Sequence, residues 1–160
     1  NITSYIDKTE KSPGFKFAEA EVNGIPVRIE IGKRDLENGK ITVARRDTKE
    51  KYQVDKNIDI VEYVNKLMNT IQKDMFNKAK ERRDSQTYEA HSFNEVEKIM
   101  NEHPGFVKAM WCGNDDCELK MKEIRGTKSR CILENHEPID NKCVVCGADA
   151  TDLVVWGIQY

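Results

Sequence analysis

The first part of the chain passes from a helical to an extended hydrophobic pattern. Ser12-Pro13 is a helix start, with a serine cap and proline at the first helical position, and Asn23-Gly24 is a helix stop. The apolar residues that share one face of this predicted helix are Phe15, Ala18 and Val22. Apolar and charged residues then alternate over residues 27–31. This period of two predicts a strand that buries one face and presents Arg28 and Glu30 on the other.

Three more elements are predicted before the middle of the chain. Short strands are expected around residues 41–43 and 52–54, joined by a turn over residues 45–49. Asp59, followed by a glutamate three residues later, has the pattern of a capping box. Apolar residues then recur at helical spacing, which predicts a long helix over residues 59–84.

The C-terminal half predicts shorter elements. Ser92 with Glu95 is a second capping box, and the amphipathic helix that it begins should end at residues 103–105. The further predicted elements are a strand over 106–111, a helix over 118–125, a strand over 129–133 and a strand over 153–160. The last strand is apolar and aromatic, so we expect it to be docked on something rather than left in water.

Composition narrows the class of protein. The 160 residues include 34% charged residues but have a net charge of only -2, so any nucleic-acid surface must be a local patch. No apolar run approaches the ~20 residues that a membrane-spanning helix needs, and we expect a cytosolic protein without a membrane partner. The chain starts at Asn1 without a methionine, so we also expect it to be part of a longer protein.

Four of the five cysteines have the spacing of a metal site. Cys112 and Cys117 form one pair, Cys143 and Cys146 form the other, and each short loop lets two thiolates reach one tetrahedral zinc ion. A glycine that follows one ligand of each pair lets the backbone turn tightly around a sulfur. We therefore predict one structural zinc ion. Cys131 lacks a close partner, and we expect it to be a buried, unligated thiol on a strand.

Other interpretations of these residues remain open. Cys143 and Cys146 alone could be a redox dithiol, although such a motif would need to open a helix after a strand. A disulfide framework would suit a small secreted chain, but it would leave Cys131 over. His136, which lies between the two pairs, could replace one cysteine as a ligand.

The sequence shows no convincing catalytic constellation. The three histidines are scattered, and there is no glycine loop of the kind that cradles phosphates. A zinc ion with four thiolate ligands has no open position at which to activate water. We therefore expect no catalytic side chain in this segment.

Several stretches resemble one enzyme family. Residues 12–17 (Ser-Pro-Gly-Phe-Lys-Phe) and 24–37 (beginning Gly-Ile-Pro-Val-Arg-Ile-Glu) resemble the anticodon-binding domain of prolyl-tRNA synthetase of the archaeal and eukaryotic type. The stretches that resemble the C-terminal zinc domain of the same family are residues 111–113, 130–132 and 143–147. The family also ends in a tyrosine, as this chain does at Tyr160.

This resemblance implies a class II aminoacyl-tRNA synthetase, which activates proline with ATP and magnesium and attaches it to its tRNA. The catalytic domain would lie upstream, and the parent enzyme would be a homodimer. The residues that match contacts to anticodon bases are Glu21, Arg28, Arg34 and Lys51. Tyr160 matches the residue whose terminal carboxylate reaches the active site. The positions that depart from the family pattern are Phe15, Ala20 and Lys33.

We thus predict a mixed α+β (α/β) fold in two domains. Residues 1–57 should be the C-terminal part of a class IIa anticodon-binding α/β domain. Residues 58–160 should form a small zinc-stapled α+β domain, opened by the linking helix over residues 59–84. The alternative function is that of a stand-alone, non-enzymatic zinc module that binds nucleic acid or protein.

Overall fold

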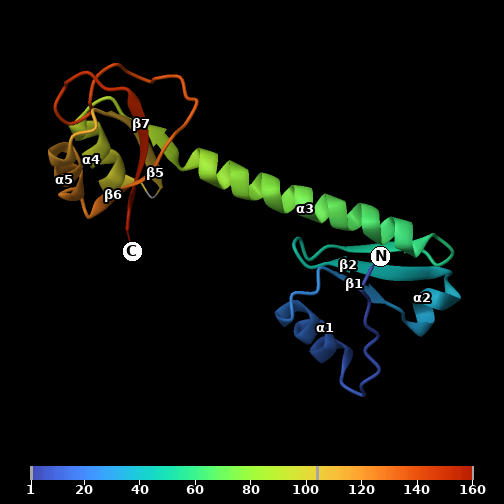
Figure 1. The fold of residues 1–160 in the computed structure, drawn as a ribbon. Coiled ribbons are helices and arrows are strands. Elements are labelled where there is room, and N and C mark those ends of the chain that lie inside the picture. Colours follow the sequence, from blue (N-terminus) through green and yellow to red (C-terminus); the bar gives the residue numbers. More distant parts are fainter. Residues whose placement is uncertain (1, 104, 160) are drawn as a thin grey trace. The chain divides into compact units, whose positions relative to one another are not determined.

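A computed structural model describes residues 2–103 and 105–159 (Figure 1). The chain divides into two compact units, Asn1–Lys78 and Ala79–Tyr160. Each unit contains one sheet with helices, so the predicted mixed α+β class is confirmed. The division falls within a helix and does not test the predicted domain boundary at residues 57 and 58, which stays a prediction. The role predicted for Tyr160 lies outside the described residues.

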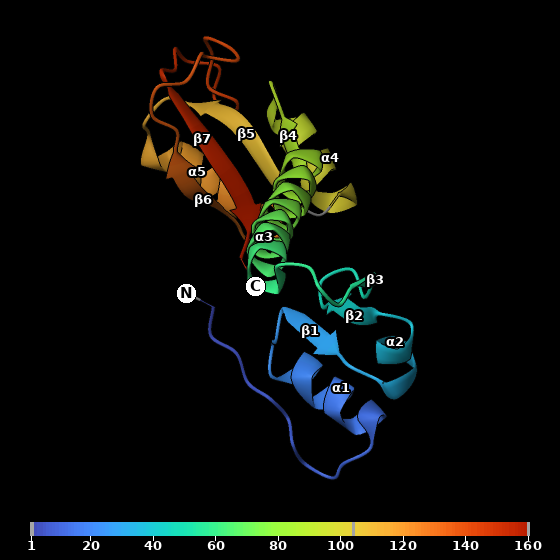
Figure 2. The same ribbon diagram turned by 90° about the vertical axis from the view of Figure 1, so that its right-hand side faces the viewer.

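The first unit is built on a three-stranded antiparallel sheet in the order β1-β2-β3. Its strands are β1 (Val27–Glu30), β2 (Lys40–Arg45) and β3 (Lys51–Asp55). Its helices are α1 (Pro13–Val22), α2 (Lys33–Glu37) and the first part of α3 (Ile60–Ser85). Helix α1 lies on one side of the sheet and α3 on the other (Figures 1 and 2). All of these elements except α2 were predicted from the hydrophobic pattern.

The predicted starts of α1 and α3 are confirmed by their caps. The Ser12 hydroxyl accepts a hydrogen bond from the Phe15 N–H at 3.4 Å. The Asp59 carboxylate accepts one from each of Val61 and Glu62, both at 3.0 Å. These bonds satisfy backbone donors that have no partner inside the helix.

The register of the sheet places charged residues on the side of α1. Arg28 pairs with Ala44, which pairs with Lys51, so these three side chains share a face. Arg28 and Glu30 are only 19% and 17% exposed, whereas Ile29 on the opposite face is 39% exposed. The prediction that β1 buries its apolar side and presents its charges is therefore wrong. The reason is that β1 is an edge strand whose charged side chains pair with neighbours on the α1 side.

The face of the sheet on the α1 side consequently presents charged side chains around one small apolar residue, Ala44. None of the residues of α1 is buried, and Phe15 and Val22 are exposed. The apolar residues of α1 follow the predicted helical spacing. Within the described residues, however, they are not part of a buried core.

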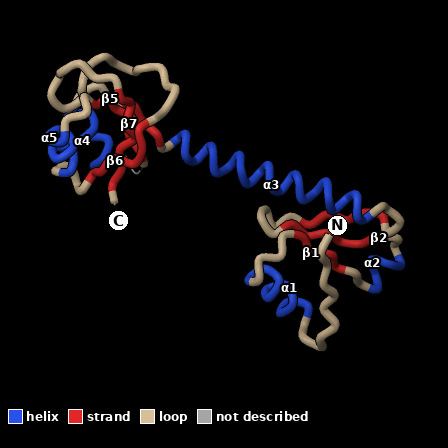
Figure 3. The backbone as a smooth tube through the Cα atoms, viewed as in Figure 1, coloured by secondary structure: helices blue, strands red, loops and turns tan. Residues whose placement is uncertain are grey.

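The second unit contains a four-stranded sheet in the order β4-β5-β7-β6. Its strands are β4 (Thr87–Glu89), β5 (Phe106–Trp111), β6 (Thr127–Ile132) and β7 (Asp152–Ile158), and its complete helices are α4 (Phe93–Glu102) and α5 (Asp115–Lys122). Strands β4 and β5 are parallel and α4 connects them, while the other pairs are antiparallel. The long segment between β6 and β7 contains no helix or strand (Figure 3). None of the described helices is long and apolar enough to cross a membrane.

Strand β7 lies at the centre of the second core. Trp156 is fully buried and pairs with Val107 of β5. On this face of the sheet it belongs to a cluster with Met100 of α4 and Met121 of α5. Over Asp152–Ile158, the last strand is thus docked between β5 and β6 of its own sheet.

In the first unit, Arg45 at the end of β2 connects the three-stranded sheet to α3. Its guanidinium donates to the two Asp47 carboxylate oxygens at 3.0 and 2.7 Å, and to Asp74 Oδ2 on α3 at 2.8 Å. Arg45 is 7% exposed. The hydrogen bonds from Arg45 hold the pKa of the Asp47 carboxyl below its ordinary value.

We expect Asp47→Asn to lower the free energy of unfolding by about 1.5 to 3 kcal/mol, because charge-assisted hydrogen bonds to Arg45 are lost. Since the pKa of Asp47 is lower in the folded state, this stabilisation is present above the unfolded-state pKa of about 3.9 and disappears as the pH falls through the folded-state value. Urea unfolding at neutral and acid pH measures both effects. The control is Glu37→Gln, at an exposed position of α2. A difference between wild type and Asp47→Asn that stayed constant into acid would contradict the argument.

Candidate functional site

Four cysteine sulfurs come together in the second unit. The residues are Cys112, Cys117, Cys143 and Cys146, whose sulfur atoms all lie within 4.8 Å of one another. Cys112 Sγ is 3.7 Å from the sulfurs of both Cys117 and Cys146. Thiolates around a tetrahedral zinc ion are roughly 3.8 Å apart, given Zn–S bonds of about 2.3 Å, whereas a disulfide needs about 2.05 Å. The cluster can therefore hold a metal ion, and all five cysteines are free of disulfides.

The first ligand pair lies where β5 passes into α5. Cys112 follows the end of β5, and Asn114 caps α5 by accepting a hydrogen bond from the Asp116 N–H at 2.7 Å. Helix α5 therefore begins at Asp115, three residues before the predicted start, because the pattern overlooked this cap. Cys117 consequently lies in the first helical turn, where the positive end of the helix dipole favours a thiolate.

The second pair lies in a turn of the segment between β6 and β7. Gly147 N–H donates to the Cys143 carbonyl at 2.9 Å, and Gly147 has a φ of 72°, which glycine adopts without strain. Cys143 and Cys146 do not open a helix. The redox-dithiol alternative, which requires a helix at this point, is therefore not favoured.

The surroundings of the sulfurs act on their pKa values in opposite ways. Burial raises the pKa of the Cys112 and Cys117 thiols. Burial would also raise the pKa of Cys143, but the N–H groups of Cys146 and Val145 bond to its sulfur and bring the pKa down to about 7. A cation at the centre would favour the thiolate form of all four. The donor set thus fits a soft divalent metal.

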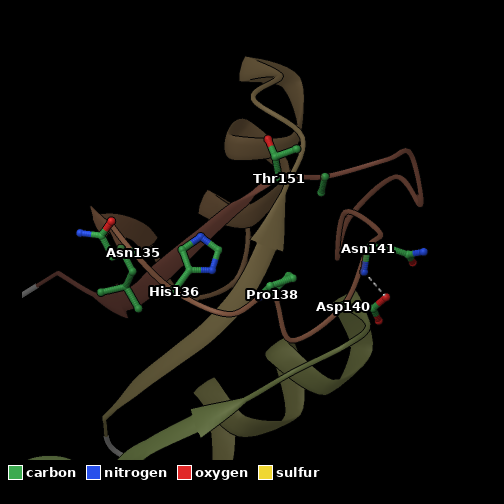
Figure 4. A pocket seen from close by; sticks show the side chains of 8 residues that line it. Asn135, His136, Pro138, Asp140, Asn141 and Thr151 are labelled. Carbon is green, nitrogen blue, oxygen red and sulfur yellow. Dashed lines mark hydrogen bonds between the residues drawn. The ribbon is translucent and has the colours of Figure 1, made fainter.

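His136 does not belong to this cluster. Its Nε2 accepts a hydrogen bond from the Leu153 N–H at 3.3 Å. The ring lines an open pocket of about 420 Å³ beside Pro138 and Thr151 (Figure 4). The alternative in which His136 replaces a cysteine ligand is therefore not favoured.

Cys131 lies on β6, as predicted, but it is exposed rather than buried. Strand β6 forms an edge of the sheet, and Thr127 is its one buried residue. The expectation of a buried thiol was wrong because a strand pattern does not reveal whether the strand is central or at an edge.

In the first unit, the structure brings together three of the four residues predicted to contact an anticodon. The Phe17 ring centre lies 4.2 Å from the Arg28 guanidinium carbon and 4.9 Å from Lys51 Nζ. Glu30 Oε1 accepts hydrogen bonds from Arg28 Nε at 3.1 Å and Nη2 at 2.9 Å, and its Oε2 accepts one from Lys51 at 2.9 Å. Glu21 Oε1 lies 3.9 Å from Arg28 Nη1. We call Phe17, Glu21, Arg28, Glu30 and Lys51 the Phe17 cluster.

Arg34 lies on α2, and its side chain is exposed. Within residues 2–103 and 105–159, no hydrogen bond or ion pair joins it to the Phe17 cluster. Sequence analysis had not assigned a role to Phe17 or Glu30. Glu30 could have been predicted as a partner of Arg28, because residues two positions apart in a strand lie on the same face.

The first unit matches a class of domain that is named for binding a tRNA anticodon. Residues 1–70 match the family model described as "Anticodon binding domain". Residues 93–160 match a second model, described as "Prolyl-tRNA synthetase, C-terminal". The chain therefore belongs to the prolyl-tRNA synthetase family, and it combines the anticodon-binding and C-terminal domains of that family.

Curated relatives support this assignment. "Proline--tRNA ligase 2" of Bacillus thuringiensis subsp. konkukian is 44% identical over 155 residues. "Proline--tRNA ligase" is 45% identical in Lachnoclostridium phytofermentans and 41% identical in Clostridium novyi. Each match covers 97% of this chain and 32% of the relative, so the chain spans about a third of the length of these proteins. These relatives are bacterial, and the expected archaeal and eukaryotic type is not confirmed.

We expect the purified protein to carry one metal ion per chain and Cys143→Ser to lose most of it, since one of four thiolate ligands is removed. Cys131→Ser is the matched control, because this thiol lies outside the cluster and should not affect metal content. Elemental analysis of both variants gives the metal-to-protein ratio. Full occupancy in Cys143→Ser, or metal loss in Cys131→Ser, would show that the ligand set is different.

Proposed function

We propose that this chain is the tRNA-reading, metal-stabilised part of an enzyme that activates proline and attaches it to its tRNA. The observation that carries the proposal is the presence, in one chain, of an anticodon-binding match over residues 1–70 and a prolyl-tRNA synthetase match over residues 93–160. Proline, ATP and magnesium would bind in a domain outside this chain. The parent enzyme would be a homodimer, as the resemblance implies.

The proposed tRNA contacts are those of Glu21, Arg28, Arg34 and Lys51 with anticodon bases. An arginine can donate two hydrogen bonds to a guanine edge, and a glutamate can accept one from a base amino group. Glu21 and Lys51 are 46% and 48% exposed, so both are accessible to a ligand. The proposed compartment is the cytoplasm, the usual site of translation; five free cysteines agree with a reducing environment.

We propose zinc as the metal held by Cys112, Cys117, Cys143 and Cys146. Soft thiolates in a set of four are the ligands of structural zinc sites. Bound zinc supplies cross-links, because it joins the end of β5, the start of α5 and the segment before β7. With four protein ligands it has no open position, so its role is structural.

The decisive experiment is Arg28→Ala in the full-length enzyme. We expect about a tenfold or greater loss of discrimination between native tRNA and tRNA with one altered anticodon base, in line with the value of a bidentate base contact. Proline activation, measured by ATP–pyrophosphate exchange, should be unchanged. The control is Arg82→Ala, at an exposed position of α3 outside the Phe17 cluster, which should leave discrimination unchanged. Even if this change weakened general binding to phosphates, it would affect both tRNAs alike. Undiminished discrimination in Arg28→Ala would refute the proposed tRNA-reading role.

A further inference from the structure

Glu30 bridges the two cations of the Phe17 cluster. One of its carboxylate oxygens accepts two hydrogen bonds from Arg28, and the other accepts one from Lys51. At 17% exposure it is the least accessible of the charged side chains in the cluster. With both oxygens already engaged, Glu30 is poorly placed to bind an RNA base itself.

Without Glu30, two positive charges would face each other across the sheet. Arg28 and Lys51 are both paired with Ala44, whose small side chain lets them converge on one Phe17 ring. Arg28 on β1 and Lys51 on β3 lie on either side of β2 and on the same face of the sheet, so their positive charges repel each other. The Glu30 carboxylate accepts hydrogen bonds from both side chains, so it offsets this repulsion and holds the two cations side by side.

The bonds to Glu30 also determine which donors remain available. Arg28 donates hydrogen bonds to Glu30 from Nε and Nη2. The planar guanidinium is therefore held against the Phe17 ring, and Nη1 is directed toward Glu21. Lys51 donates one of its three N–H groups to Glu30, so two N–H groups remain for a ligand.

The charges of the cluster sum to zero, with two cations and two carboxylates. A neutral set that combines free donors with the acceptor Glu21 suits the edge of a nucleobase, which carries both kinds of group. A phosphate, in contrast, is bound by a surplus of positive charge.

We infer that Glu30 is a positioning residue for anticodon reading, which orients Arg28 and Lys51 so that their free donors and the Glu21 carboxylate meet one nucleobase edge. This inference rests on the proposed function. Glu30 acts through Arg28 and Lys51 and does not itself touch the RNA.

The test compares Glu30→Gln, Arg28→Ala and the double variant in the full-length enzyme. The readout is the ratio of kcat/KM for native tRNA to that for tRNA with one altered anticodon base. Both values come from the same sample, so this ratio cancels any loss of correctly folded enzyme. We expect Glu30→Gln to lower the ratio about tenfold, similar to Arg28→Ala. Glu97→Gln, an exposed carboxyl on α4, is the matched control and should leave the ratio unchanged.

The double variant decides whether Glu30 acts through Arg28. We expect its ratio to equal that of Arg28→Ala alone, because residues that act as one unit give non-additive effects. A normal ratio in Glu30→Gln, or two fully independent losses, would overturn the inference while Arg28→Ala still supports the proposed function. A normal ratio in Arg28→Ala would overturn the proposed function itself.

Discussion

The second unit depends on the convergence of four cysteine sulfurs within 4.8 Å of one another. These residues come from the end of β5, the first turn of α5 and the segment between β6 and β7. That segment has no helix or strand, and the apolar cluster beside it is small, with Cys117 and Cys143 among its members. A long irregular segment gains little from its own hydrogen bonds or core. Metal–thiolate bonds are the strong interaction that can hold it in one conformation.

The first unit holds charged groups close to its sheet and leaves some of them exposed, as with Glu21 and Lys51. On one face, Arg45 is fastened to Asp47 and Asp74 and helps to hold α3. On the other face, Arg28 and Lys51 share Glu30 and the Phe17 ring. The Arg45 contacts and the Phe17 cluster both combine cations with carboxylates, but only the Phe17 cluster retains an exposed donor at Lys51 and an exposed acceptor at Glu21. The same chemistry therefore ties α3 to the sheet on one side and holds the Phe17 cluster together on the other.

The two units also differ in how their apolar residues are used. In the second unit, β7 and the helices α4 and α5 bury Trp156 in a continuous cluster. In the first, α1 buries none of its residues and Ile29 remains exposed at the sheet edge. The first unit thus combines polar side-chain contacts on its α1 face with a small buried apolar set from β2 and α3, which includes Val43, Val64 and Ile71. The second unit combines its apolar core with a metal-binding cluster.

The sequence by itself determined the features that depend on neighbours along the chain. Caps at Ser12, Asp59 and Ser92, the strand over 106–111 and the spacing of the four cysteines could all be predicted, because each arises from residues within a few positions of one another. The start of α5 was missed only because the Asn114 cap went unrecognised.

Tertiary structure alone decided that Cys131 is exposed and that the charged side chains of β1 are largely covered, since burial depends on whether a strand lies at an edge and on what packs against it. It alone also brought Phe17 and Lys51 together, because 34 positions separate them and only the packing of α1 on the sheet closes that distance.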